Sequence, residues 1–303
     1  MRYYILVSNS PDLFADTLKG LPKDKIQVVI NTLLKDQEES LVSVCEKYEV
    51  PYIITESDTR PATGKNCLMK CFLESDDEYG VFIDGGDVIT PTGVRFYEEL
   101  SREENPPDVL VLYKQVAVYK LDVDLLVPDM LVSDFPKRWE PVYPYDKSVN
   151  DICHMSEQEL YNWLKAQRPL EVSLEMESKE RYKFQQFMNE YSENYEYMTR
   201  MVFISRKAAK RMYYDNSLIL GEDTKQYLQL KKLAQEGHLR VLKKKDGLDK
   251  PPTYLQVIDP KGVVLRTVRN LTGWDWCQPF NHEMERMKSS GELPEPYEVP
   301  EYL

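Results

Sequence analysis

The stretch that decides the fold is GVFIDGGD, residues 80–87. It opens with a short apolar run of strand length and stops at two glycines flanked by Asp84 and Asp87. Such a run, bounded by a turn signal, is typical of a strand buried on both faces of a sheet. We therefore expect a buried strand over 80–83 that carries two carboxylates at its carboxyl end.

Strand and helix patterns alternate on the N-terminal side of this stretch. The strands are expected at 3–7, 25–30 and 51–55, and the helices at 12–19, 37–48 and 63–74. This order predicts an α/β fold whose mostly parallel sheet is flanked by helices. Ligands of such sheets bind beyond the carboxyl ends of the strands. The polar residues expected at those ends are Ser8, Asn9, Asn31, Asp84 and Asp87.

The 303 residues allow either two domains or one enlarged sheet domain. Further strands are expected at 108–113, 116–121 and 201–205, and further helices at 156–167, 179–195, 206–213 and 224–236. A proline-containing stretch without periodicity predicts a loop or lid around 127–150. We divide the chain into a first sheet half at 1–113, an insertion at 114–197, a second sheet half at 198–245 and a C-terminal extension at 246–303.

Composition narrows the class of protein. Hydrophobic residues make up 42% of the chain and charged residues 30%, which is typical of a globular protein. The net charge of −12 argues against binding of nucleic acid or an anionic membrane over the whole surface. No apolar run approaches the roughly 18 residues of a membrane span. The five scattered cysteines and the absence of a signal-peptide pattern predict a cytoplasmic protein.

Two acidic sites stand far apart in the sequence, Asp84-Gly85-Gly86-Asp87 and Glu222-Asp223. With these residues the chain resembles glycosyltransferases of the GT-A fold, especially the family 2 group. The resemblance covers roughly 1–113 and 198–242, and the segments that carry it are 4–9, 63–66, 81–87 and 220–237. It implies a hexosyl- or pentosyltransferase that takes its sugar from a nucleotide-sugar donor, most simply a UDP-sugar.

The resemblance also assigns roles to residues. It implies that the nucleoside lies against Val7, Ser8, Asn9 and Asn31, and that the diphosphate or ribose lies near Arg60, Gly64, Lys65, Asn66 and Asp84. It places a Mn²⁺ or Mg²⁺ ion at Asp84 and Asp87, with His282 as a further ligand from beyond the catalytic helix. It makes Asp223, beside Glu222, the base that deprotonates the acceptor hydroxyl.

The chemistry agrees with this division of roles. A nucleoside diphosphate gains negative charge as it leaves, and a divalent ion held by carboxylates stabilises that charge. One well-placed carboxylate suffices to remove the acceptor proton, which favours direct displacement with inversion. Two departures from the family pattern stand out. Gly86 occupies the third position of the Asp-x-Asp motif, and Asn31 stands where an acidic residue usually contacts the base.

The acceptor is left open between saccharides, small molecules and DNA. Residues 199–269 contain 16 Lys or Arg against 7 Asp or Glu, so this segment carries +9 in a chain of −12. An anionic acceptor is therefore one hypothesis. Bacteriophages glycosylate hydroxymethylated pyrimidines with dedicated transferases, and in that case the enzyme would work in the host cytoplasm. A flipped base could stack on Trp274 or Trp276, although core packing explains these residues equally well.

Simpler structural roles compete with each assignment. Asp223 fits a helix N-cap with Gln226 in the capping-box position, and 84–87 fits an ordinary turn. Loss of the metal site would leave a non-catalytic module that binds nucleotide sugars or nucleic acid. A nucleotidyltransferase is disfavoured because Ser8-Asn9-Ser10 lacks a glycine-rich, basic phosphate loop. The three scattered histidines give no zinc-site spacing.

Overall fold

The computed structural model describes residues 1–58, 60–119, 139–143, 155–166, 168–169, 200–218, 222–247 and 249–258. Most of the predicted lid, the helix expected at 179–195, and His282, Trp274 and Trp276 lie outside these residues. None of the described helices combines the length and the hydropathy that a membrane span requires.

The described strands are β1 (Arg2–Val7), β2 (Ile26–Ile30), β3 (Tyr52–Ile54), β4 (Tyr79–Asp84), β5 (Val88–Ile89), β6 (Val109–Tyr119), β7 (Trp139–Tyr143), β8 (Arg168–Pro169), β9 (Arg200–Ser205), β10 (Val241–Lys245) and β11 (Tyr254–Ile258). The described helices are α1 (Pro11–Lys19), α2 (Lys35–Tyr48), α3 (Pro61–Glu74), α4 (Pro91–Leu100), α7 (Glu157–Ala166), α9 (Arg206–Ala209) and α10 (Glu222–Gln235). A 3₁₀ turn, Lys23–Lys25, precedes β2.

These strands form one sheet in the order β3-β2-β1-β4-β9-β6-β11-β5. Neighbours among the first four run parallel, whereas β9 lies antiparallel between β4 and β6. Strands β10 and β7 also pair with β6, both in parallel, and β8 pairs with β7. The predicted fold class, a mostly parallel sheet flanked by helices, is confirmed.

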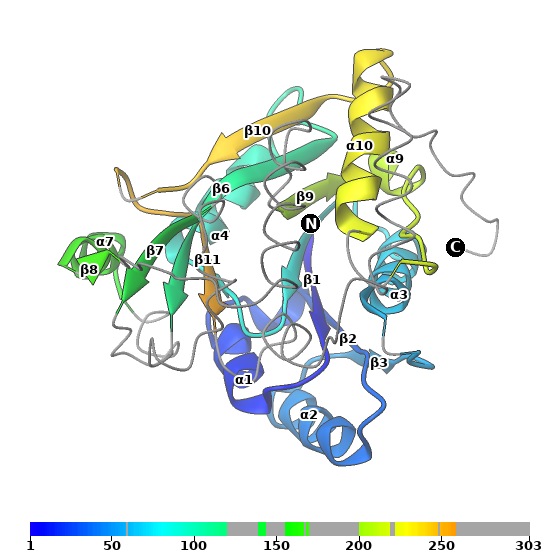
Figure 1. Ribbon diagram of the computed structural model, residues 1–303, viewed down its shortest axis with the longest axis vertical. Coiled ribbons are helices and arrows are strands. Elements are labelled where there is room, and N and C mark those ends of the chain that lie inside the picture. Colours follow the sequence, from blue (N-terminus) through cyan, green and yellow to red (C-terminus); the bar gives the residue numbers. More distant parts are fainter. Residues whose placement is uncertain are drawn as a thin grey trace, which may run out of the picture.

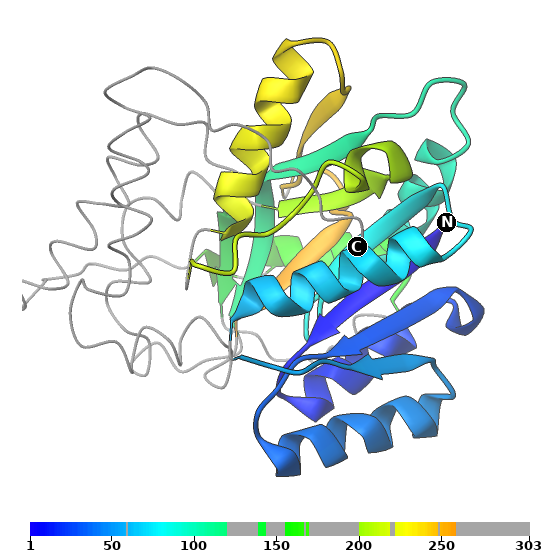
Figure 2. The ribbon, with the colours of Figure 1, turned by 90° about the vertical axis from the view of Figure 1, so that its right-hand side faces the viewer.

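Successive side chains of each strand point to opposite faces of the sheet, so helices pack on both faces (Figure 1). On one face Tyr4 and Phe82 pack with α3, α9 and α10. On the other face Tyr3 and Ile5 pack with α1, α2 and α4. Figure 2 shows α3 lying across the sheet on the side that faces the viewer. This packing fixes the start of α3 beside the ends of β1 and β2.

Three predicted elements, namely two strands and one helix, differ from the structure, and one helix was not predicted. The two strands expected at 108–113 and 116–121 are one strand, β6, whose first half pairs with β9 and β10 and whose second half pairs with β7 and β11. The polar Gln115 lies within this strand, where it is fully buried and donates to the side chain of Gln256 on β11. Helix α9 ends at Ala209 instead of 213, and α4 was not among the predicted helices.

Candidate functional site

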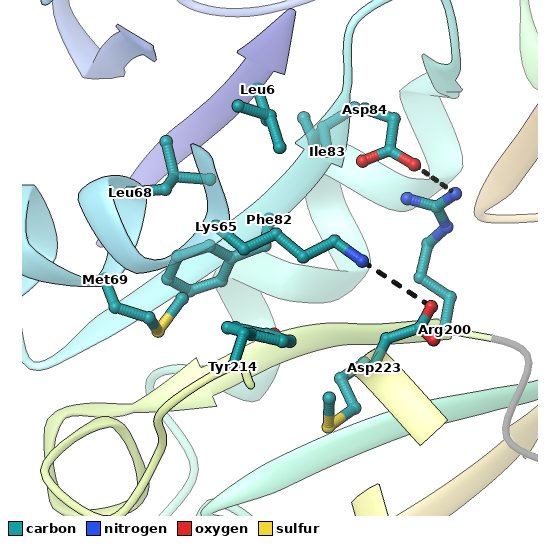
Figure 3. A pocket seen from close by; sticks show the side chains of 11 residues that line it. Leu6, Lys65, Leu68, Met69, Phe82, Ile83, Asp84, Arg200, Tyr214 and Asp223 are labelled. Atoms are coloured by element: carbon teal, nitrogen blue, oxygen red, sulfur yellow. Dashed lines mark hydrogen bonds and ion pairs between the residues drawn. The ribbon is translucent and has the colours of Figure 1, made fainter. Parts of the chain in front are cut away.

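A pocket lies at the edge where β4 ends and β9 begins (Figure 3). Its charged lining comes from four elements, namely Lys65 on α3, Asp84 on β4, Arg200 on β9 and Asp223 on α10. The apolar part of the lining is Leu6, Leu68, Met69, Phe82, Ile83, Met201 and Tyr214. Lys65, Asp84 and Asp223, which the sequence singled out, therefore meet at the expected edge of the sheet. Arg200, from the basic segment, joins them there.

At one end of the pocket Arg200 lies between two carboxylates. Its Nη2 atom is 2.8 Å from Oδ2 of Asp84 and 3.2 Å from Oδ2 of Asp87. The guanidinium also stacks over the ring of Tyr254 on β11, 4.9 Å from its centroid. The Asp84 side chain is 53% exposed, whereas the Asp87 side chain is only 8% exposed. Arg200 thus joins an accessible acid to a buried one.

Asp87 is engaged by protein donors on both oxygens. The Tyr254 hydroxyl donates to Oδ2 at 2.5 Å, and the backbone N–H of Val257 donates to Oδ1 at 3.0 Å. The turn before it is also closed, because the N–H of Asp87 donates to the carbonyl of Asp84 and the N–H of Gly86 donates to Thr17 on α1. Residues 84–87 therefore form the turn that the simpler interpretation predicted, and Asp87 links this turn to β11.

At the other end of the pocket Lys65 lies between a second pair of carboxylates. Its Nζ atom is 2.6 Å from Oε1 of Glu222 and 3.6 Å from Oδ2 of Asp223. Figure 3 shows Lys65 reaching from α3 towards Asp223. Glu222 is 5% exposed and Asp223 is 40% exposed. Asp223 is thus the accessible acid at this end.

Burial and charge shift the pKa values of these groups. Burial raises the pKa of Glu222, and the ammonium of Lys65 offsets part of that rise. Burial lowers the pKa of Lys65, but Asp223, Glu222 and Asp84 outweigh it, so the net shift is upward and the lysine is charged. Burial raises the pKa of Asp84, but the positive charges of Arg200 and Lys65 lower it by more. The net shift is downward, so this acid is ionised at neutral pH.

The residues expected around the nucleoside lie together at the ends of β1 and β2. Val7 is buried, and its carbonyl accepts from the N–H of Asn31 at 2.8 Å. The Asn31 side chain accepts from Thr55 and donates to the carbonyl of Arg60, so the protein already uses both ends of its amide. Ser8 and Asn9 follow β1 at the same edge and are partly buried.

The residues expected near the diphosphate divide into two groups. Lys65 faces the pocket, whereas Asn66 is buried and exchanges hydrogen bonds of 2.8 and 2.9 Å with the backbone of Tyr214. Arg60 donates to the carbonyl of Asn216. Asn66 and Arg60 therefore hold the segment before α10 against α3. Gly64 packs so closely on β1 that a Cβ atom there would lie 2.6 Å from Leu6.

Asp223 is a helical residue and not the N-cap that the capping-box interpretation required. Helix α10 begins at Glu222, one residue earlier. Gln226 does not complete a capping box either, because its Oε1 accepts from the N–H of Tyr213 at 2.7 Å. The Asp223 carboxylate is thus directed by its helix into the pocket that it lines.

Arg200 and Tyr254 were missed as site residues in the sequence. Arg200 was counted only as part of the basic segment, one position before a predicted strand. The register pairs Tyr79 with Ser205 and Val81 with Phe203, and its continuation sets Arg200 opposite Asp84. The sequence could indicate the position of Arg200 only if the antiparallel pairing of β9 with β4 were already known. Tyr254 belongs to a strand that the sequence did not predict.

The described residues do not fit the divalent metal site that the resemblance implied. Asp87 is buried and already receives the Tyr254 hydroxyl, the Val257 N–H and the Arg200 ion pair. Gly86 has a φ of 110°, and a Cβ atom there would point towards Leu13 on α1, away from the pocket. Within the described residues no group of three or more His, Cys, Asp or Glu side chains converges. His282, the remaining expected ligand, lies outside them.

Comparison with known proteins finds fold likenesses at low identity. No family model matches the chain. No curated protein matches it either. S. aureus TarS in complex with UDP-GlcNAc is 13% identical with a TM-score of 0.46, over 88% of this chain and 61% of that one. A mannosyltransferase from Pyrobaculum calidifontis in complex with GDP-Man and Mn²⁺ is 11% identical with a TM-score of 0.42, over 93% and 68%.

A third likeness belongs to a different activity. The inositol-1-phosphate CTP transferase of T. maritima is 12% identical with a TM-score of 0.39, over 86% of this chain and 90% of that one. This chain spans 60% of the length of the first TarS structure. At these values the likenesses assign no activity, substrate or metal to the chain.

Proposed function

We propose that this chain is a glycosyltransferase that moves a sugar from a nucleotide-sugar donor to an acceptor hydroxyl. The observation that supports it is the convergence of an accessible carboxylate, Asp223, with the cations Lys65 and Arg200 in one pocket at the carboxyl edge of the sheet. Transfer of a glycosyl group needs both a base for the acceptor and positive charge for the leaving diphosphate.

The reaction is assigned as a single displacement. The acceptor oxygen forms a bond to the anomeric carbon, and the bond between that carbon and the diphosphate oxygen breaks. Asp223 takes the proton from the acceptor hydroxyl, and the diphosphate departs with the bonding electron pair. Attack from the face opposite the leaving group inverts the anomeric centre. Asp223 is the catalytic residue in this proposal, and Glu222 is a positioning residue that holds Lys65 beside it.

For the acceptor we propose an anionic molecule, with hydroxymethylated DNA as the first to be tested. The support is the basic charge of residues 199–269, where Lys210, Arg211, Lys245 and Lys250 are exposed. Positive surface charge attracts phosphates whatever their sequence. Sugar transfer to hydroxymethylated DNA and not to unmodified DNA would support this acceptor, and transfer only to neutral saccharides would exclude it.

The first experiment tests donor use and the role of Asp223 together. UDP-, GDP-, ADP- and CDP-sugars are screened by thermal shift, since a ligand that binds only the folded state raises its stability. The donor that binds is then assayed for transfer with wild type and with Asp223→Asn. We expect the variant to lose about 100-fold or more of its turnover while it still binds the donor, because a general base contributes about 100- to 10,000-fold.

The matched control is Asp36→Asn. Asp36 is the second residue of α2, as Asp223 is the second residue of α10, so both changes remove an acid from the first turn of a helix. We expect Asp36→Asn to leave turnover unchanged. Donor binding without turnover in the wild type would favour the non-catalytic module, and a normal rate in Asp223→Asn would exclude Asp223 as the base.

A further inference from the structure

We propose that Arg200 takes the place of the divalent metal ion in this site and, with Lys65, binds the diphosphate of the donor. The inference rests on the proposed function and deepens it, because it names the group that stabilises the leaving diphosphate. Binding of the diphosphate then requires no divalent ion, contrary to what the sequence resemblance implied.

The position of Arg200 is the first step. Continuation of the β4–β9 register sets Arg200 opposite Asp84, at the strand end where the resemblance placed the metal. Its guanidinium bridges Asp84 and Asp87, the two expected metal ligands, at 2.8 and 3.2 Å. A permanent positive charge therefore already stands between these two acids.

The second step is that Asp87 holds the guanidinium in place. Asp87 is buried, and the Tyr254 hydroxyl and the Val257 N–H occupy its oxygens at 2.5 and 3.0 Å. A metal ion would have to displace these protein donors from a buried carboxylate, which is costly. The ring of Tyr254 also lies against the guanidinium, at 4.9 Å. Asp87 and Tyr254 thus hold the guanidinium of Arg200 in place.

The third step is the turn itself. The third position of the metal motif is Gly86, whose φ of 110° is strained for any residue with a side chain. A Cβ atom there would lie 3.6 Å from the Cβ of Leu13, on the side of α1. The backbone therefore directs position 86 away from the pocket, and a carboxylate there could not join Asp84 around an ion.

The fourth step is that Arg200 has an exchangeable partner. Its Nε atom is buried and has no hydrogen-bond partner among the described residues. Asp84 is more than half exposed, so a phosphate can replace it on the guanidinium without burying the displaced carboxylate. Arginine binds phosphate with two parallel hydrogen bonds, and Lys65 lines the same pocket as a second cation. Two positive charges then face a diphosphate.

The test measures binding of inorganic pyrophosphate and of UDP and GDP by calorimetry, with EDTA and separately with Mn²⁺. We expect binding in EDTA, with an affinity that Mn²⁺ changes by less than about twofold. Arg200→Gln should weaken binding about tenfold or more, the range of a lost charged hydrogen bond. Asp84→Asn should instead strengthen it about two- to fivefold, because it removes an exposed carboxylate that competes for Arg200.

Asp84→Asn separates the two models. If Asp84 held a metal ion, this variant would lose binding and Mn²⁺ would be needed in the wild type. Binding that appears only with Mn²⁺, or that falls in Asp84→Asn, overturns the inference and leaves the proposed function standing. Absence of binding under every condition counts against both.

Folding is controlled with further variants. Arg200→Gln leaves the buried Asp87 without its cation, so the double variant Arg200→Gln with Asp87→Asn removes both charges together. Arg200→Lys keeps the charge and should recover part of the affinity without recovering the paired geometry. Arg102→Gln is the matched control, because Arg102 is 71% exposed and its ion pair among the described residues is with Glu98 at 3.8 Å. We expect wild-type affinity from it, and weak binding in all four variants would show a loss of folding that thermal unfolding detects.

Discussion

The two ends of the pocket repeat one arrangement with different residues. At each end a cation lies between a buried acid and an accessible acid, Arg200 between Asp87 and Asp84, and Lys65 between Glu222 and Asp223. The buried acids differ in their support. Asp87 also accepts from Tyr254 and Val257, whereas the partner of Glu222 among described side chains is Lys65.

This difference separates two tasks. The Arg200 end is held by several protein groups and keeps its charge in place, which suits the binding of a leaving group. The Lys65 end depends on one cation, so the ionisation of Glu222 depends on Lys65. Asp223 is accessible and lies 3.6 Å from the ammonium, so it can give up this ion pair when a substrate arrives, which suits a base. Three sets of variants test how far this contrast holds.

The largest effect on stability is expected at the less supported end. Lys65→Met leaves the Glu222 carboxylate buried without its cation, and we expect a loss of about 3 kcal/mol in the free energy of unfolding at pH 7.5. Lys70→Met, on the same helix, removes an exposed lysine that is 4.0 Å from Glu74, and should cost less than about 0.5 kcal/mol. Urea denaturation measures both.

The pH dependence gives the sign of the same effect. The folded-state pKa of Glu222 is raised by burial, and loss of Lys65 raises it further. An acid with a raised folded-state pKa binds its proton more tightly when folded, so the folded state gains stability as the pH falls and loses it as the pH rises past that pKa. The deficit of Lys65→Met should therefore shrink at pH 5. A deficit independent of pH would show that lost packing, and not the buried charge, causes it.

An intermediate effect is expected where the buried acid has other donors. Tyr254→Phe removes one hydrogen bond to Asp87 and keeps the ring against Arg200, so we expect a loss of about 1–2 kcal/mol. Tyr214→Phe is its counterpart, because the ring of Tyr214 lies 5.4 Å from Nζ of Lys65. We expect it to change stability by less than about 0.5 kcal/mol. Equal losses in the two variants would remove the proposed difference in support.

The smallest effect is expected at the accessible acids. Asp84→Asn and Asp223→Asn each remove a carboxylate that is 53% or 40% exposed, and exposed ion pairs contribute about 0–1 kcal/mol. We expect both variants to unfold within about 1 kcal/mol of the wild type, with differences that shrink further in 0.5 M salt. Losses as large as that of Lys65→Met would contradict the assignment of these two acids as exchangeable partners.

Much of the fold could be predicted because its signals are local. The run at residues 3–7 and the helical spacing at 37–48 correspond to β1 and α2 within one or two residues. The break expected between 113 and 116 was wrong, because β6 runs through these residues and Gln115 within it donates to Gln256 on the distant strand β11. A hydrogen bond to a residue far away in the sequence thus accompanies one continuous strand.

The candidate site divides in the same way. Asp84 and Asp223 could be singled out in the sequence from a strand end and a helix start, and Lys65 through the resemblance. Arg200 could not, because its role depends on the antiparallel pairing of β9 with β4, which no local pattern encodes. The partners of Asp87 come from β11, 167 and 170 residues away, and no local pattern could indicate a contact over that separation.

The sequence by itself determined the alternation of strands and helices, the acidic strand end and the acidic start of α10. These features follow from hydrophobic periodicity and turn chemistry, which act over a few residues. Only the tertiary structure decided which acid is buried, which is exposed, and which cation each one faces. Burial and ion pairing depend on side chains that the sheet brings together from distant parts of the chain, and in this pocket they set an arginine where the sequence pattern predicted a metal ion.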